Sequence, residues 1–531
     1  MKLHRIRLLD GEMLGILQEF EHVFAPQADD GIEPYCFVGE NGTGKSRLLQ
    51  CLAEIFCWLD TRTRLFRPDR DAEIGFRFEI EYEIHAANRP RRIIIRNTAD
   101  RKRPQVVAIG KDDREEEIEG DESIRSVLPH FVVGYTSGDN ETLSVPFLDV
   151  KAEYAAELRE RALFRRWNRE DIPDLRLVMM DYHSNLSILV SNFLLQDEKR
   201  LKLLEDFVRT KGVESFRLII QTKHQAARKK IKVKVEDAKG QAKQETRVGV
   251  QLVPQLEEYI EQLRKCSTCH DHQSKENRWT FDFFVQGATR DAFRHFFGTA
   301  YNLCMAFQRL SMLNELIVPS KHRDKIAKIR RDEKIVVKPP TPAEEEKVFR
   351  FETVRLQLRD AAEPLDYISI SDGEHQFAHI FGTLLMFDQP NTLFLLDEPE
   401  SHFNPQWRIK FVPLVNEIVR GKHHCLLLTS HAPFVISDCK AQNVYIFKRN
   451  ESRRGVEATT PKTETYGASF DRLLEDVFGV KPPVARKSLK ELRQLQQDGT
   501  QDQIEKRLAD FGDSPVKFYL YQRLEKLKKE K

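Results

Sequence analysis

The sequence contains no long uninterrupted run of hydrophobic residues. A membrane-spanning helix needs roughly 18 apolar residues in a row, and no window of the chain approaches that. The opening segment carries charges throughout, where a secretion signal needs an apolar stretch. We therefore expect a soluble, cytoplasmic protein with no membrane partner.

The chain also has little net charge and few cysteines. Its 85 Lys and Arg against 83 Asp and Glu leave +2 over 531 residues, which excludes a uniformly basic coat for nucleic acid. Any nucleic-acid surface must be local. The eight cysteines lie mostly in apolar segments, as expected of buried thiols in a reducing compartment rather than of a disulfide framework.

A phosphate-binding motif lies near the N-terminus. The apolar run 35–38 predicts a strand, a glycine-rich turn follows, and helical spacing of leucines begins at Leu48. The turn fits the pattern G-x-x-x-x-G-K-[ST], in which backbone N–H groups wrap phosphates, the lysine reaches the terminal phosphates and the serine ligates Mg²⁺. The residues expected to hold ATP are Gly39, Asn41, Gly42, Gly44, Lys45 and Ser46.

A second motif ends a later apolar strand with two carboxylates. Residues 392–396 predict the strand, and Asp397 and Glu398 follow it. Phosphoryl transfer requires charge neutralisation and positioning of the attacking water. We expect Asp397 to hold Mg²⁺ with Ser46, and Glu398 to orient or deprotonate the water.

Two further segments indicate the class of ATPase. Ser371 and Gly373 begin the segment SDGEHQ, and His431 follows the apolar strand predicted at 425–428. This order resembles the ABC ATPase superfamily. The resemblance implies a dimer or larger assembly in which Ser371 and Gly373 cap the ATP of a partner subunit. It also implies that Glu398 is the catalytic glutamate and that His431 contacts the terminal phosphate.

One element of that superfamily has no counterpart here. The resemblance implies a glutamine-bearing loop after the first lobe, but the corresponding segment 133–140 contains no glutamine. Asn140 is a weak substitute, and the role is left unassigned.

The motif sequences SDGEHQ, DEPESHFNP and TSHAPF more specifically resemble the OLD-like ATPases of anti-phage defence, and within them the PtuA-type ATPases of Septu and of retron systems. The resemblance covers roughly 1–150 and 350–480. It implies a separate HNH nuclease subunit (PtuB-like). In retron versions it also implies an RNA-linked DNA and a reverse transcriptase.

The chain divides into four segments by pattern. Segment 1–150 holds the phosphate loop and a strand pair at 74–84 and 92–96, which predicts an antiparallel β subdomain. Segment 151–350 is expected to be a mostly helical insertion with basic stretches. Segment 351–480 carries the remaining ATPase motifs, and 481–531 a helical C-terminal tail. The predicted fold class is α/β, an ABC-type P-loop ATPase head carrying these additions.

The insertion contains two basic groups. Residues 230–235 alternate lysine with aliphatic residues, so a strand there would place lysines on one face, and a second group spans Lys321 to Arg331. Clustered cations suit contact with the DNA or RNA backbone, although a solvated face is the alternative.

A short segment of the insertion has the residue types of a zinc site. Cys266, Cys269, His270 and His272 lie within seven residues. Compact zinc sites usually draw ligands from two separated pairs, and no second pair is evident. A turn at a helix end that carries free thiols is the alternative.

These motifs predict an ATPase that gates a nuclease partner and has no nuclease site of its own. Two alternatives remain. One is a DNA-repair or SMC-like clamp without a nuclease, and the other is a scaffold that holds ATP and scarcely hydrolyses it.

Overall fold

The computed structural model describes most of the chain. The described residues are 1–26, 33–64, 73–86, 89–99, 103–110, 112, 114–137, 141–164, 175–225, 230–236, 242–318, 322, 325, 342–450 and 455–529. None of the helices among them is long and apolar enough to cross a membrane.

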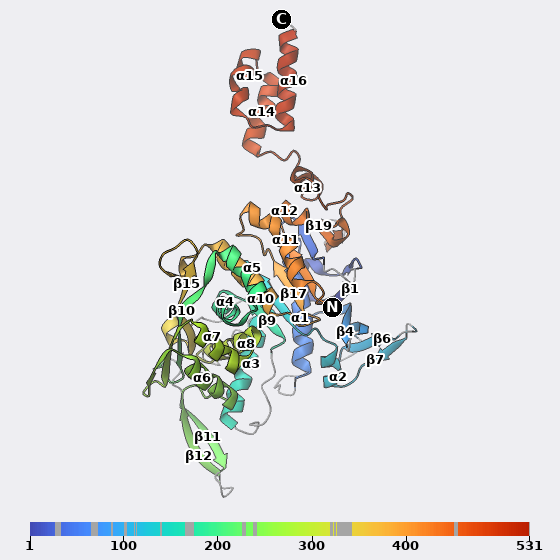
Figure 1. Cartoon of the computed structure of the whole chain (residues 1–531). Coiled ribbons are helices and arrows are strands. Elements are labelled where there is room, and N and C mark those ends of the chain that lie inside the picture. The colour runs from blue at the N-terminus through green and yellow to red at the C-terminus, as the bar shows by residue number, and fades with distance from the viewer. Residues whose placement is uncertain are drawn as a thin grey trace.

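A seven-stranded sheet lies at the centre of the molecule, in the order β20-β19-β3-β18-β17-β8-β9 (Figure 1). All neighbouring strands are parallel to each other, except that β19 and β20 are antiparallel. The strands predicted at 35–38, 392–396 and 425–428 are confirmed as members of this sheet. The bounds are β3 (Tyr35–Gly39), β8 (Val132–Thr136), β9 (Leu177–Met180), β17 (Leu393–Asp397), β18 (Cys425–Thr429), β19 (Val444–Asn450) and β20 (Gly455–Thr459).

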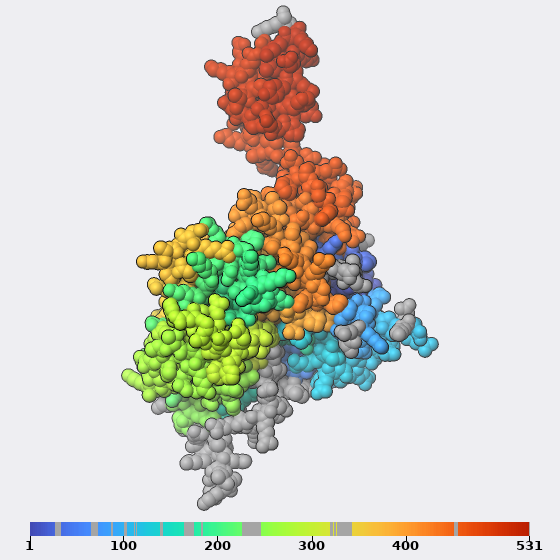
Figure 2. Space-filling model, viewed as in Figure 1, coloured from blue at the N-terminus to red at the C-terminus, as the bar shows by residue number. Residues whose placement is uncertain are grey.

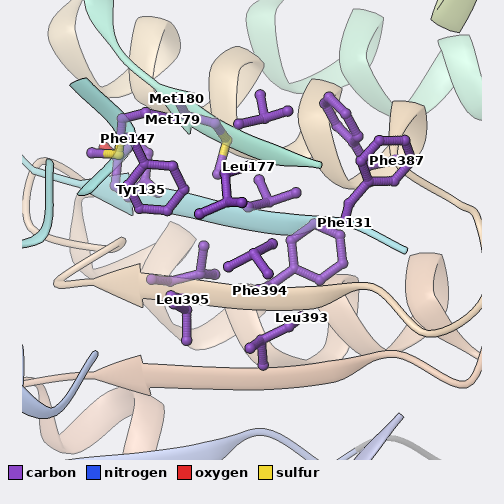
Figure 3. Packing of buried hydrophobic residues seen from close by; sticks show 14 of the residues in the cluster. Phe131, Tyr135, Phe147, Leu177, Met179, Met180, Phe387, Leu393, Phe394 and Leu395 are labelled. Atoms are coloured by element: carbon purple, nitrogen blue, oxygen red, sulfur yellow. The ribbon is translucent and has the colours of Figure 1, made fainter. Parts of the chain in front are cut away.

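The three middle strands β3, β18 and β17 are buried at every residue. Strands covered on both faces read as continuous apolar runs, which is why the sequence pattern identified them. Figure 3 shows the packing beside β17, where Phe131 and Phe387 meet at one end and Tyr135, Phe147 and Met179 at the other. This dense core fixes the position of the carboxylates that end β17.

Helices pack around this sheet. The helix α1 (Lys45–Arg62) follows the phosphate loop directly and contacts four strands of the sheet. The helix α3 (Glu141–Phe164) packs along α1, so it crosses the boundary expected at residue 150. The remaining helices of this part are α10 (Asp372–Met386), α11 (Pro405–Val419), α12 (Pro433–Ile436) and α13 (Phe470–Asp476), with a 3-10 helix η1 (Glu12–Leu17) near the N-terminus.

A six-stranded antiparallel sheet lies beside the central sheet, in the order β2-β1-β4-β5-β6-β7. The predicted hairpin is present as β4 and β5, but β4 begins at Phe78 rather than Ile74. Its bounds are β1 (Lys2–Leu8), β2 (Phe20–Val23), β4 (Phe78–Ala86), β5 (Arg89–Asn97), β6 (Gln105–Ile109) and β7 (Glu115–Glu117), followed by the helix α2 (Asp121–Ser126).

The insertion contains a sheet that the helical expectation for 151–350 did not include. Five strands lie in the order β13-β14-β10-β15-β16, and all neighbours are antiparallel. The strand β9 also lies inside this range but belongs to the central sheet. The insertion strands are β10 (Thr210–Gln221), β13 (Cys269–Gln273), β14 (Arg278–Phe284), β15 (Phe349–Leu358) and β16 (Leu365–Asp366). The helices are α4 (Tyr182–Leu195), α5 (Glu198–Val208), α6 (Pro254–Cys266), α7 (Gly287–Phe297) and α8 (Ala300–Met312).

The lysine-rich segment at 230–235 is confirmed as a strand. It forms β11 (Lys230–Glu236), which pairs with β12 (Ala242–Val248) in a two-stranded hairpin that projects from the body (Figure 1). The side chains of 226–245 lie outside the described residues. Of the second basic group only Lys325 lies inside them.

The C-terminal segment forms a separate helical unit. The helices α14 (Arg486–Asp498), α15 (Gln501–Arg507) and α16 (Pro515–Lys529) surround a small core of their own. Figure 2 shows this unit joined to the rest by a narrow neck. The helical tail expected at 481–531 is confirmed, and at the start of its last helix Lys517 N donates to Ser514 Oγ at 3.2 Å.

Candidate nucleotide-binding site

Three neighbouring strands end at the same edge of the central sheet and bring the sequence motifs together. The strand β3 leads into the phosphate loop, β17 ends at Asp397 and β18 ends at Thr429. Asp397 lies opposite Thr429 in the register, and Thr429 lies opposite Phe37. The carboxyl ends of parallel strands are where ligands bind in open α/β sheets.

The phosphate loop needs glycine for steric reasons. Gly39 has φ 137°, and a Cβ there would lie 2.4 Å from the carbonyl oxygen of Phe447 on the neighbouring strand β19. Gly44 has φ 91° and immediately precedes α1. Only glycine adopts such conformations at little cost, which leaves the loop's N–H groups free to turn toward a phosphate.

Lys45 is held inside the loop by backbone acceptors. Its Nζ donates to the carbonyl oxygens of Gly39 at 2.9 Å and Glu40 at 3.0 Å, and the residue is 6% exposed. Burial lowers the pKa of Lys45, while the nearby carboxylates of Glu398 and Asp397 oppose that shift. The ammonium group is therefore positioned to exchange these carbonyl contacts for phosphate oxygens.

The residues expected to hold Mg²⁺ meet in the structure. Ser46 Oγ donates to Asp397 Oδ1 at 2.8 Å, and Thr429 Oγ1 donates to the same oxygen at 2.6 Å. A hydroxyl and a carboxylate are hard oxygen donors of the kind that Mg²⁺ prefers, so this pair fits the ion. Ser46 and Asp397 would hold the ion, which would supply positive charge to neutralise the phosphates.

Glu398 adopts an unusual backbone conformation. Its φ is 48°, in the left-handed region that residues other than Gly and Asn rarely adopt. Its N–H donates to Thr429 Oγ1 at 3.0 Å, which holds the residue in place. Strained conformations of this kind occur at functional sites. The carboxylate is half exposed and faces the nucleotide cavity.

His431 lies beside Glu398, with 3.7 Å between Nε2 and Oε1. Burial lowers the pKa of His431, and the positive charge of Lys45 lowers it further. The imidazole is therefore neutral at physiological pH, so the contact is not an ion pair. A neutral imidazole can donate one hydrogen bond to a phosphate oxygen.

These groups line one cavity of about 730 Å³. The phosphate-loop residues, Glu398 and His431 form part of its wall. The other residues that line the cavity belong to no sequence motif and were not predicted. They are Glu12, Met13, Leu14, Gly15, Ile16, Arg47, Gln50, Thr142 and Val145.

The signature residues lie elsewhere. Ser371 caps α10, where its Oγ donates to Glu374 Oε2 at 2.8 Å, and the residue is exposed. Neither Ser371 nor Gly373 is among the described residues that line the cavity of the same chain. Asn140 lies outside the described residues, so its candidacy for the glutamine role stays a prediction.

The zinc expectation is not supported. Cys266 is buried at the end of α6, and burial raises the pKa of its thiol to about 12. Cys269 and His270 are adjacent on β13, so their side chains point to opposite faces, and the ring of His272 stacks on Trp279 at 4.0 Å. Within the described ranges no three His, Cys, Asp or Glu side chains form a group that could hold a metal ion.

The solved structures that this chain resembles include SMC head domains. One, bound to the C-winged helix domain of ScpA, is 9% identical, with a TM-score of 0.34 over 87% of this chain and 98% of the other. A head with an extended coiled coil bound to the C-terminal domain of ScpA, from Pyrococcus furiosus, is 11% identical, with a TM-score of 0.31 over 93% and 99%. The head from Thermotoga maritima is 9% identical, with a TM-score of 0.33 over 87% and 100%. No curated protein matches the chain.

A family model matches residues 59–437 and carries the description "AAA domain, putative AbiEii toxin, Type IV TA system". The matched span includes the signature, the carboxylate strand β17 and His431, while the phosphate loop ends at Ser46, before the span begins at residue 59. Membership implies the use of ATP and Mg²⁺, for which the residues at this cavity are suited. Because the match covers well over half of the sequence, the chain belongs to this AAA-domain family.

Proposed function

We propose that this chain is an ATP-hydrolysing gate for a partner nuclease in bacterial anti-phage defence. The observation that carries the ATPase part is the assembly of Lys45, Ser46, Glu398 and His431 around one cavity, with Asp397 hydrogen-bonded to Ser46. The nuclease and defence context rest on the resemblance of the motif sequences to PtuA-type ATPases, whose partner is an HNH endonuclease.

The site works by positioning. Lys45 and the loop N–H groups bind the phosphates of ATP, and Ser46 and Asp397 hold the metal. Glu398 orients the attacking water and accepts its proton, since its carboxylate faces the cavity. His431, neutral and close to Glu398, donates to the terminal phosphate.

We further propose that the active species contains two copies of the chain. Ser371 is exposed and absent from the described lining of its own cavity, so a second copy can present it to the ATP. ATP then holds the copies together, and hydrolysis releases them. In a retron context an RNA-linked DNA and its reverse transcriptase would restrain this cycle.

The test uses Glu398→Gln as an ATP-trapped form. We expect this variant to bind ATP as the wild type does and to lose about 100-fold or more in kcat, because the water loses its base. Glu417→Gln, an exposed change on α11, is the matched control and should behave as wild type. Normal turnover by Glu398→Gln would remove Glu398 from its role.

The partner is tested with the same variant. The tagged chain is expressed with its native gene neighbourhood and purified with ATP and Mg²⁺. A stoichiometric HNH protein supports the nuclease gate, and RNA-linked DNA beside it supports the retron context. Recovery of the chain without any nuclease contradicts the proposal.

A second candidate is a DNA clamp of the SMC or repair type without a nuclease. The observation that favours it is the projecting β11–β12 hairpin, whose sequence alternates lysine with aliphatic residues. Cations arranged along a strand suit the phosphate backbone of DNA. Stimulation of the purified chain's ATPase activity by duplex DNA, with a strong salt dependence, would favour this function.

A further inference from the structure

Gln50 carries a buried acceptor that nothing in the described chain satisfies. The residue lies on the second turn of α1, lines the nucleotide cavity and is 2% exposed. Its Nε2 donates to Glu54 Oε1 at 2.6 Å. Its Oε1 has no hydrogen-bond partner among the residues the structure describes. Buried polar atoms are almost always paired, so this one requires an explanation.

The pairing with Glu54 fixes which way the amide points. Burial raises the pKa of Glu54 to about 7, so above that pH its carboxylate can only accept. The amide nitrogen must therefore face Glu54, and the amide oxygen must face away from it. Gln50 lines the cavity, and this oxygen is a buried acceptor at the cavity wall without a described partner.

Gln50 lies one helical turn after Ser46 on α1. The two residues are four apart in the chain, so their side chains lie on the same face of the helix. On that face the hydroxyl of Ser46 donates to Asp397. An ion held by Ser46 and Asp397 keeps several water ligands, and their hydrogens need acceptors.

The element expected to supply such a group offers no glutamine. Segment 133–140 contains none, and the next cavity-lining residues, Thr142 and Val145, lie on α3. Within the described lining Gln50 is the one glutamine.

We propose that Gln50 Oε1 accepts a hydrogen bond from a water ligand of the Mg²⁺ that accompanies ATP. Gln50 is thus a positioning residue that substitutes for the absent loop glutamine. The inference depends on the proposed function only for the binding of ATP, and not for a nuclease partner.

The test measures equilibrium binding of the non-hydrolysable analogue AMP-PNP to the full chain, once with Mg²⁺ and once with EDTA. We expect Gln50→Leu to lower the affinity about 10-fold with Mg²⁺, because residues that support metal ligands contribute on this scale, and to leave the affinity in EDTA unchanged. Gln18→Leu, an exposed change beside the site, is the matched control and should alter neither value.

A swapped pair, Gln50→Glu with Glu54→Gln, provides the rescue. The new amide at 54 donates to the new carboxylate at 50, which still presents an oxygen to the cavity. We expect the swap to restore the Mg²⁺-dependent affinity, and it carries the test if Gln50→Leu fails to fold.

Three outcomes decide the inference. An equal loss with Mg²⁺ and with EDTA, no loss in either, or failure of the swap to restore binding overturns it. If the wild type itself does not bind AMP-PNP, the ATP site of the proposed function fails as well. If the wild type binds normally and the Gln50 variants show no metal-specific effect, only this inference fails.

Discussion

Glu400 is a buried carboxylate behind the nucleotide site, and its ionisation should cost stability. The residue is 3% exposed and accepts a hydrogen bond from Ser430 Oγ, while its Oε2 has no partner among the described residues. Burial raises the pKa of Glu400 to about 7 from an ordinary value of 4.5. The perturbation is Glu400→Gln, which keeps the shape and removes the charge.

Glu400 binds its proton more tightly in the folded state than in the unfolded state, because its pKa is higher in the folded state. The contribution of this proton to folding stability is therefore complete below pH 4.5 and is lost as the pH rises through 7. A difference of about 2.5 pKa units corresponds to about 3 kcal/mol. The pKa of about 7 already includes the hydrogen bond from Ser430, so Glu400→Gln should be more stable than wild type by about 3 kcal/mol at pH 8.5 and nearly equal to it at pH 5.

The assay is denaturant unfolding of the wild type and the variant at pH 5 and pH 8.5. Only the difference between the two proteins is used, because every other titrating group contributes equally to both. Glu417→Gln is the control, since that carboxylate is exposed on α11 and should show no pH-dependent difference. A wild-type-to-variant difference that is the same at both pH values would refute the raised pKa and the reasoning from burial.

Two further predictions concern the catalytic site. Lys45→Ala chains lack the phosphate contact, and Ser371→Arg chains lack a usable signature. Mixing the two should restore about a quarter of wild-type turnover, because about half of the dimers are mixed and each mixed dimer keeps one complete site of two. A mixture as inactive as its components would contradict the shared site. His431→Ala should lower kcat about 100-fold. Because burial and Lys45 lower the pKa of His431, wild-type turnover should decline only below pH 6.5, and a decline that begins above pH 7 would contradict the neutral imidazole.

The central strands and the nucleotide motifs were predictable because their signals are local. The short apolar run 393–396 is typical of a strand buried on both faces. The phosphate loop contains glycines where the backbone adopts positive φ angles, which other residues rarely adopt. The structure brings Ser46 and Asp397 together because the parallel strands β3 and β17, which flank β18, end at one edge of the sheet.

The sheet of the insertion was missed because its pairing is not local. The strand β10 pairs with β14 and β15, whose first residues are Arg278 and Phe349, far along the chain from Thr210. Its alternation of Phe216, Leu218 and Ile220 lies directly after helix α5, where a helical pattern was already in progress. The alternation itself favours a strand, so the missing information was the position of the partner strands and not the period.

The residues that support the site could be identified only from the three-dimensional structure. Nothing in the sequence marks Thr429 as the hydroxyl shared by Asp397 and Glu398, or Glu400 as the acceptor for Ser430. The zinc expectation failed for the same reason, because spacing alone cannot show that neighbouring strand residues point to opposite faces.

The sequence by itself determined the chemistry of the nucleotide site, because phosphate binding, metal binding and water activation each require particular residue types in a fixed local order. The tertiary structure alone decided which groups become buried next to that site. Burial sets the pKa of Glu400, and it leaves Gln50 Oε1 without a partner. Desolvation depends on everything that packs around an atom, and most of those neighbours are distant in the chain.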